Sequence, residues 1–361
     1  MTLKILHTSD LHIGMKFSSY SEEIKEQLVE ARFLSLENMI NKSNDLECDL
    51  FIVAGDLFNS IQVSKKDLKR TAQILNKFNG SFVLILPGNH DYDNNIVELW
   101  REFERMNLEN IILLNKHEIY NLNVHDKNVN IYPAYCHNKH SSTNNLTWIK
   151  ETDINTDEIN IGISHGAIEG LSADLEGNYF LMGLSELENI PVDLWLLGHT
   201  HVRYPYVEEI NDHKIFNAGT HEPDGLNYQD EGSCWYIELS KEKTIAKRLI
   251  TGKYRFKDLY KEIENDEQFF GVKDELVSSI TSEHIVRLNL KGSVSKELYS
   301  NISNIYKELE ETFFHLIVND SELKLKIDSE IIKKEFTQGS FPYEFLMSLE
   351  DDEEALQLAY E

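Results

Sequence analysis

The amino-acid sequence predicts an α/β fold in which buried strands alternate with helices. Short continuous apolar runs lead into Gly, Asp, Asn or His, which is typical of buried strands that end in loops. Apolar residues recur at helical spacing between the first of these runs. Such alternation is characteristic of layered α/β architectures. The five predicted strands are residues 3–7, 50–54, 82–86, 159–164 and 194–197.

Three helices are predicted between the early strands, and Ser64 stands at the N-cap position of the second. Each helix is defined by apolar residues that would face the core. These residues are Ile24, Leu28, Ala31 and Met39 in the first helix; Leu68, Ala72, Leu75 and Phe78 in the second; and Ile96, Trp100 and Phe103 in the third.

The later part of the chain predicts a second sheet and a small additional unit. Three consecutive strands without helices between them indicate a second sheet stacked on the first; they are residues 214–217, 234–239 and 244–250. A strand, helix, strand order follows at residues 285–290, 295–311 and 313–318. We therefore expect a main domain at residues 1–252, a small α/β domain at 253–335 and a tail at 336–361.

The composition is that of a globular protein. The chain has 361 residues, of which 41% are hydrophobic, enough for a well-buried core. No apolar run approaches the roughly 18 residues that span a bilayer, and the chain starts on a strand-like run instead of a signal peptide. These features predict a cytoplasmic protein without a membrane segment. Cys48, Cys136 and Cys234 lack paired spacing, so we expect reduced, structural thiols. Cys136, His137 and His140 are interpreted as a local loop, since no second ligand pair is nearby.

The net charge of -27 is unusual for a protein that binds nucleic acid, because such proteins normally present basic residues to phosphates. Much of the acidic surplus lies in residues 258–361, which hold 24 acidic and 10 basic side chains. Two basic clusters precede this region and are interpreted as solvated faces. They consist of Lys65, Lys66, Lys69 and Arg70, and of Lys247, Arg248, Lys253, Arg255 and Lys257.

Five motifs with metal-binding side chains lie where strand-like runs give way to loops. In the first, Asp10 and His12 are two residues apart, so both can project to the same side and grip one cation. In the second, Gly55 permits a sharp turn and Asp56 can bridge two cations.

The third motif, residues 88–91, offers the amide oxygen of Asn89 as a ligand and His90 as a proton donor. The fourth contributes His165, and the fifth contributes His199 and His201, again two residues apart. Each motif alone has an ordinary explanation as a helix cap, a turn or a hydrogen-bonded loop. All five together, each after an apolar strand, indicate a metal site.

The donor set predicts two divalent ions. Mixed oxygen and imidazole donors suit Mn²⁺, with Fe²⁺, Zn²⁺ or Mg²⁺ as alternatives, and no thiolate is present to favour zinc. Asp10 and Asp56 are the only anionic ligands, so the loaded site would keep a charge of about +2 and attract a phosphodiester.

In this order the motifs resemble the signature of the calcineurin-like metallophosphoesterases. Within that group, Leu57 and Phe58 after Asp56, together with the extra small domain, are similar to the SbcD-type nucleases of DNA double-strand-break repair. The resemblance covers residues 3–250 well and the remainder loosely. It implies a four-layer β-sandwich flanked by helices, a cap formed by the small domain, and hydrolysis of phosphodiester bonds in DNA.

The resemblance also implies roles for individual residues. His90 would be the catalytic histidine beside the scissile phosphate, and we expect Asp91 to orient it. One metal would be held by Asp10, His12, Asp56 and His201, and the other by Asp56, Asn89, His165 and His199. Part of the nuclease family carries histidine where this chain has Asn59, which makes 3′ to 5′ exonuclease action a weaker expectation than endonuclease or phosphodiesterase action.

Members of that family act with an SbcC-like coiled-coil ATPase and as homodimers, so the resemblance implies both partners. The apolar residues 341–347, followed by the acidic run 350–354, are either a docking segment for the ATPase or a final helix packed on the cap. Such a partner would supply the basic DNA surface that this chain lacks.

Two other functions stay open. A phosphatase or cyclic-nucleotide phosphodiesterase acting on small molecules would use the same motifs and suit the acidic surface, although it would not need the additional domain. A non-catalytic scaffold for the ATPase would need neither the seven ligands nor His90.

Overall fold

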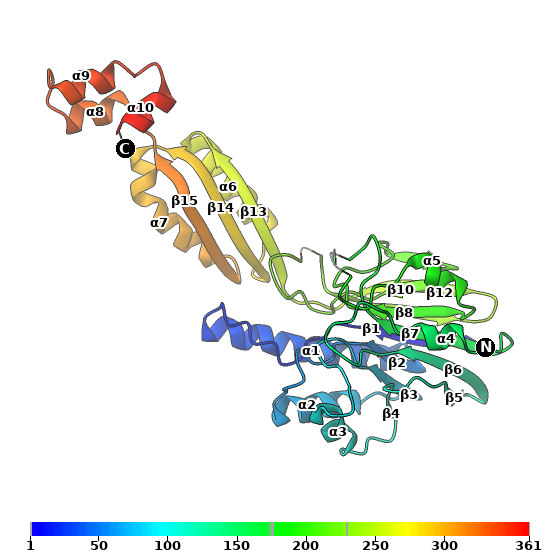
Figure 1. Ribbon diagram of the computed structural model, residues 1–361. Coiled ribbons are helices and arrows are strands. Elements are labelled where there is room, and N and C mark those ends of the chain that lie inside the picture. The colour runs from blue at the N-terminus through cyan, green and yellow to red at the C-terminus, as the bar shows by residue number, and fades with distance from the viewer. Residues whose placement is uncertain (1, 173, 175–176, 229, 361) are drawn as a thin grey trace. The chain divides into compact units, whose positions relative to one another are not determined.

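The computed structural model describes residues 2–172, 174, 177–228 and 230–360. The chain forms two compact units, Met1–Arg255 and Phe256–Glu361, shown in Figure 1. Each unit has its own sheet structure and its own hydrophobic core. Within the described ranges, no helix is long and apolar enough to cross a membrane.

The first unit contains a seven-stranded sheet in the order β4-β3-β2-β1-β11-β12-β9. Strands β1 to β4 are parallel and follow one another outward, as expected for strands connected through helices. The other side of β1 pairs antiparallel with β11, and β12 and β9 extend this half. The bounds are β1 Leu3–Thr8, β2 Leu50–Ala54, β3 Phe82–Leu86, β4 Ile111–Leu113, β9 Glu209–Asn211, β11 Ser233–Leu239 and β12 Thr244–Ile250.

A five-stranded sheet in the order β10-β8-β7-β6-β5 lies against the first. Strands β6, β7, β8 and β10 are parallel, and β5 forms an antiparallel hairpin with β6. The bounds are β5 Tyr120–Val124, β6 Lys127–Ala134, β7 Ile159–His165, β8 Leu194–Gly198 and β10 Ile215–Asn217.

The first unit has four layers, because each of its two sheets is buried on both faces. Ile5 and Ile52 of the large sheet meet Ile161 of the smaller sheet in the central core. The opposite face of the large sheet packs against α1, α2 and α3, and the outer face of the smaller sheet packs against α4 and α5. The helices are α1 Glu22–Asp45, α2 Lys65–Leu75, α3 Glu98–Glu104, α4 Thr147–Lys150 and α5 Leu184–Asn189. The predicted α/β sandwich flanked by helices is confirmed.

The prediction that residues 214–217, 234–239 and 244–250 form one second sheet is wrong. Only β10 joins the smaller sheet, next to β8. β11 and β12 extend the large sheet, with Leu239 opposite Leu3. A run of apolar residues predicts that a strand is buried, but it does not predict the strand with which it pairs. That partner depends on the path of the chain in three dimensions.

The predicted helices are present, with shifted ends. The Ser64 side chain accepts the backbone N–H of Asp67 and caps α2, as predicted. Phe78 lies beyond the end of α2, and Ile96 precedes α3 and is largely exposed. The β5–β6 hairpin was not predicted, because β5 alternates polar and apolar residues and lacks a continuous apolar run.

The second unit is built on a three-stranded sheet in the order β13-β14-β15. β14 and β15 are parallel and are joined by α7, which confirms the predicted strand, helix, strand order, although both strands extend further than expected. β13 and α6 were not predicted. The bounds are β13 Arg255–Ile263, α6 Asp266–Ser279, β14 His284–Val294, α7 Lys296–Glu310 and β15 His315–Leu325.

Three short helices complete the chain around a small apolar core that includes Ile332, Leu346 and Leu356. They are α8 Ser329–Glu335, α9 Phe341–Met347 and α10 Glu353–Tyr360. Asp328 and Ser340 cap α8 and α9 with their side chains. The side chains of 353 and 354, at the end of the acidic run, lie outside the described part of the chain.

Candidate metal centre

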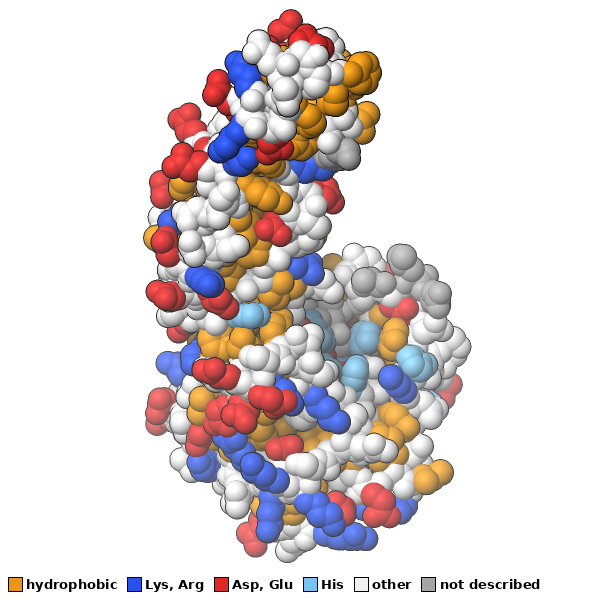
Figure 2. All heavy atoms as spheres, turned by 90° about the vertical axis from the view of Figure 1, so that its left-hand side faces the viewer, with side chains coloured by type: hydrophobic (Ala, Val, Ile, Leu, Met, Phe, Trp, Pro, Cys, Tyr) orange, Lys and Arg blue, Asp and Glu red, His pale blue; other side chains and the backbone are white. Residues whose placement is uncertain are grey.

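All five motifs meet at one edge of the first unit, where parallel strands of both sheets end. Residues from the ends of β1, β2 and β3 face residues from the ends of β7 and β8. Histidine side chains gather on one face of this unit (Figure 2). The carboxyl ends of parallel strands are where open α/β sheets place their functional loops, which explains why the motifs, far apart in sequence, converge.

The backbone of these loops is held in uncommon conformations. Asp10, His12, Asp56 and His199 all have positive φ values, of 53°, 45°, 53° and 92°. The backbone N–H of Asp10 donates to the Gly55 carbonyl at 3.1 Å, and that of His12 donates to the Asp56 carbonyl at 2.9 Å. Strained conformations of this kind persist where surrounding contacts hold them, and they cluster at functional sites.

Gly55 is required by close packing as well as by its φ of +92°. A Cβ atom at this position would lie 2.0 Å from Nδ1 of His165. The glycine therefore lets the loops after β2 and β7 approach closely enough for Asp56 and His165 to face the same centre.

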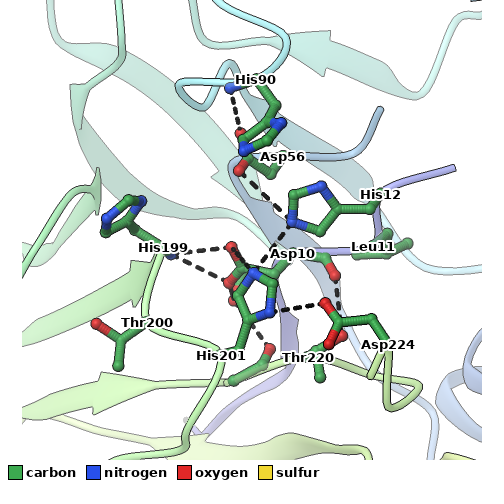
Figure 3. Close-up of polar contacts among 12 residues, drawn as sticks. Asp10, Leu11, His12, Asp56, His90, His199, Thr200, His201, Thr220 and Asp224 are labelled. Carbon is green, nitrogen blue, oxygen red and sulfur yellow. Dashed lines mark hydrogen bonds and ion pairs between the residues drawn. The ribbon is translucent and has the colours of Figure 1, made fainter. Parts of the chain in front are cut away.

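One cluster of donors joins residues that follow β1, β2 and β8 (Figure 3). Nε2 of His12 lies 3.2 Å from Nε2 of His201 and 3.7 Å from Oδ2 of Asp56. Nε2 of His201 is 3.8 Å from Oδ1 of Asp10. Asp10, His12 and Asp56 are fully buried.

A second cluster shares Asp56 and is centred on Asn89. Oδ1 of Asn89 lies 3.0 Å from Nε2 of His165 and 3.0 Å from Nδ1 of His199. Nε2 of His165 is also 3.3 Å from Oδ2 of Asp56. The seven predicted ligands are thus brought together in two groups, with the Asp56 carboxylate common to both.

Hydrogen bonds on the far side of two rings leave their lone pairs facing the centre. Nδ1 of His165 donates to the Ala54 carbonyl at 2.8 Å, and Nδ1 of His201 donates to Asp224 at 2.9 Å. The Nε2 atoms of both rings then face carboxylate or amide oxygens, which are also electron-pair donors. A divalent cation in each group would replace the protons that these clustered donors otherwise share, so the residues fit the metals.

The electrostatics favour positive charge at the same place. Burial lowers the pKa of the His165 ring, but the charge of Asp56 and a hydrogen bond to it prevail and raise the pKa to about 9. Burial also opposes the charged form of His201, and the hydrogen bond to Asp224 together with the charge of Asp10 raise its pKa to about 9. Bound divalent cations would supply the positive charge that these buried carboxylates attract.

His90 lies at the edge of the site and is partly exposed. Its backbone N–H donates to Oδ1 of Asp56 at 2.8 Å, and its ring packs edge-on against His12 with centroids 4.8 Å apart. Nδ1 of the ring lies 3.1 Å from the Asn59 carbonyl. Asn59 thus contacts His90 through its backbone.

The expectation that Asp91 orients the His90 ring is not supported by its contacts. The buried carboxylate of Asp91 accepts the backbone N–H groups of Gly88 at 2.7 Å and Phe58 at 2.9 Å. Burial and the charge of Asp56 raise the pKa of Asp91 to about 8, although both backbone hydrogen bonds oppose this shift. Asp91 therefore stabilises the loop that carries Asn89 and His90. Its carboxylate faces the loop backbone instead of the His90 ring, because neighbouring residues on a tight turn point in different directions.

The structure adds supporting residues that the sequence did not indicate. The fully buried Arg32 of α1 donates to the carbonyls of Leu11 at 2.8 Å and Asp10 at 3.4 Å. The Thr220 hydroxyl donates to the Asp10 carbonyl at 3.1 Å. The sequence held one signal of a buried role for Arg32. It lies four residues after Leu28, which places a charged side chain on the apolar face of the helix.

The loop at residues 136–140 adds no side chain to the donor groups described above. Cys136 is buried and its thiol contacts the His165 carbonyl at 3.3 Å. His137 packs against Phe180, and His140 packs against Tyr179. Across the described ranges, none of the three belongs to a cluster of potential metal ligands.

A family model described as calcineurin-like phosphoesterase matches residues 3–203, which is more than half of the chain. Fold and site thus define a metal-dependent phosphoesterase with ligands for a dinuclear divalent centre. The chain belongs to the calcineurin-like phosphoesterase family.

Two individual proteins illustrate the range of similarity. The DNA double-strand break repair protein Mre11 of Methanosarcina acetivorans is 32% identical over 109 residues, which is 29% of this chain and 17% of the relative. The chain therefore matches less than a fifth of that relative's length. The crystal structure of TT1561 of Thermus thermophilus has a TM-score of 0.41 and 13% identity, over 67% of this chain and 96% of that chain.

Proposed function

We propose that this phosphoesterase hydrolyses phosphodiester bonds in DNA with two divalent metal ions, of which Mn²⁺ suits the donors best. The observation that carries the proposal is the pair of donor groups that share the Asp56 carboxylate. One ion would be held by Asp10, His12, Asp56 and His201, and the other by Asp56, Asn89, His165 and His199.

Two divalent ions in such a site supply Lewis acidity, a water nucleophile at neutral pH and charge that stabilises the phosphoryl transition state. The chain's own contribution is to place ligands and a proton donor around the phosphate. His90 is partly exposed at the edge of the site, its main chain donates to Asp56, and its ring contacts the Asn59 carbonyl. We assign to it the proton that the leaving oxygen takes up.

DNA as the substrate is supported by similarity to a protein named for double-strand break repair and by a second folded unit beyond the phosphoesterase unit. The net charge of -27 would favour a small-molecule substrate instead. On the face shown in Figure 2, acidic and basic side chains are interspersed. The attraction for a phosphodiester would therefore come from the metal centre itself.

The direct test is cleavage of end-labelled single-stranded and double-stranded DNA in Mn²⁺, alongside bis-p-nitrophenyl phosphate. We expect cleavage of DNA by the wild-type chain, none by the Asp56→Ala variant and none with EDTA. A ladder of products would indicate exonuclease action, and discrete fragments would indicate endonuclease action. Cleavage of the small ester without cleavage of DNA would contradict the DNA substrate and favour the small-molecule phosphodiesterase.

We further propose that the three C-terminal helices dock an SbcC-like coiled-coil ATPase. Phe341 and Phe345 of α9 are 80% and 46% exposed, and their rings stack at 5.9 Å, so they form a small apolar surface. Exposed aromatic pairs of this kind are typical anchors of helix-mediated interfaces.

Replacement of both phenylalanines by serine is expected to abolish co-purification with an SbcC-like ATPase produced in the same cells, because the apolar anchors are lost. The matched control is Tyr260→Ser on β13, which removes an exposed aromatic ring (72%) elsewhere in the same unit. Retention of the ATPase by the double variant would contradict docking through α9, and circular dichroism would verify that the helices persist.

A further inference from the structure

The two donor groups differ in how their imidazoles are held. A metal-binding histidine normally has its second ring nitrogen fixed by a carbonyl or a carboxylate, which sets the direction of the lone pair. In the Asn89 group, the Ala54 carbonyl does this for His165. In the other group, Nδ1 of His12 is buried and has no hydrogen-bond partner among the described residues. Among the described imidazoles of that group, His201 is the one held in this way, through its contact with Asp224.

Asp224 is well placed for such a role. Its Oδ2 lies 2.9 Å from Nδ1 of His201, and its side chain is only 16% exposed. Figure 3 shows the carboxylate at one nitrogen of the His201 ring, Nδ1, while the other nitrogen, Nε2, faces His12. Asp224 therefore contacts the ligand and leaves the cation position to Asp10, His12 and Asp56.

The loop that carries Asp224 is anchored at several points, so the carboxylate is fixed before any metal binds. The Glu222 carbonyl accepts from the Thr220 hydroxyl at 2.9 Å and from Arg32 at 3.2 Å. The Glu222 carboxylate accepts the backbone N–H groups of Lys253 at 2.7 Å and Tyr254 at 2.8 Å. Because the loop that carries Asp224 is held in place, less entropy is lost when the His201 ring is ordered for metal binding.

We propose that Asp224 is a positioning residue that sets the affinity of one of the two metal ions, the one held by Asp10, His12 and His201. It does so through the orientation of the His201 ring and the negative charge behind it. This inference rests on the proposed dinuclear centre. The ion of the Asn89 group, whose His165 is held by a backbone carbonyl, keeps its affinity when Asp224 is replaced.

The experiment is calorimetric titration of the full-length, metal-free chain with Mn²⁺. We expect the wild-type chain to bind two ions. In Asp224→Ala one ion should bind about 10-fold to 100-fold more weakly, the range found when groups that orient metal ligands are removed, and the other should bind unchanged. Electron paramagnetic resonance should show loss of the spin-coupled Mn²⁺ pair at an ion concentration that saturates the wild-type site.

Two further variants separate positioning from folding. Asp224→Asn keeps an acceptor for Nδ1 of His201 without the charge, so we expect a smaller loss at the same ion. Asp49→Asn changes a buried carboxylate at the other end of β2, which accepts the backbone N–H of Lys4 at 2.8 Å. It should lower thermal stability in EDTA while both Mn²⁺ affinities stay at the wild-type level.

Unchanged affinities in Asp224→Ala and Asp224→Asn would overturn the role of Asp224 while leaving the dinuclear centre intact. Equal weakening of both ions in Asp224→Ala, matched by Asp49→Asn, would show that the substitution at Asp224 acts only through the stability of the fold. A wild-type chain that binds fewer than two Mn²⁺ ions would instead overturn the proposed centre on which the inference rests.

Discussion

Replacing Asp56 with alanine is expected to remove both metal ions and all phosphodiesterase activity together. The Asp56 carboxylate lies 3.7 Å from Nε2 of His12 and 3.3 Å from Nε2 of His165, so it belongs to both donor groups. Its loss leaves Asp10 as the only anionic ligand for two divalent ions. The backbone N–H of His90 also loses its acceptor, since it donates to Oδ1 of Asp56 at 2.8 Å.

The measurement is Mn²⁺ titration by calorimetry in parallel with hydrolysis of bis-p-nitrophenyl phosphate. Asp49→Ala is a matched control, because Asp49 is also buried and stands at the other end of β2. It accepts the backbone N–H of Lys4 and pairs with His125, so its loss should cost about 1–2 kcal/mol of stability and leave metal binding intact. Full Mn²⁺ binding by Asp56→Ala would refute the shared-ligand arrangement.

Replacing His90 with alanine is expected to lower kcat by about 10²-fold to 10⁴-fold, the usual contribution of a general acid, while both ions still bind. The ring is partly exposed at the edge of the site, and its Nδ1 contacts the Asn59 carbonyl, which leaves Nε2 available for the leaving oxygen. The loss should be largest for DNA, whose deoxyribose oxygen needs a proton, and smallest for an ester that releases p-nitrophenolate.

The measurements are activity on both substrates and Mn²⁺ binding by the same variant. Together they distinguish a proton donor from a metal ligand. His125→Ala serves as a control, because it removes a histidine whose contact partner, Asp49, lies at the opposite end of β2. His90 also lies close enough to His12 and Asp56 to complete a group of three potential ligands. If the His90→Ala variant loses a metal ion, or loses activity equally on both substrates, His90 is a ligand and not the proton donor.

Much of the core and the motif positions could be predicted from local patterns. Residues 50–54 and 82–86 are continuous apolar runs because strands of a sheet covered on both faces have no polar side. The metal-binding motifs were recognisable because each follows such a run directly, where the chain leaves the sheet. Ser64 marked the start of α2 through hydrogen bonding that depends only on the next three residues.

Such local patterns could not predict contacts between segments that are distant in sequence. The strands at 234–239 and 244–250 were placed in the wrong sheet, because the free edge of β1 becomes available only once the chain has folded back. Asp91 neighbours His90 in sequence, yet its carboxylate faces Phe58 and Gly88. Asp224 reaches His201, and Arg32 reaches Asp10, through contacts between separate elements.

By itself, the sequence determined which residues form the buried strands, which side chains are the candidate metal donors, and that the chain is a metal-dependent phosphoesterase. Local hydrogen bonds and hydrophobic periodicity involve only a few neighbouring residues, so they can be predicted from the sequence. The tertiary structure decided how donors divide around Asp56, and which imidazoles are held by a second group. Those properties depend on distances of about 3 Å between segments that are far apart in sequence, such as His12 and His201, which are 189 residues apart, and only the packing of the two sheets sets them.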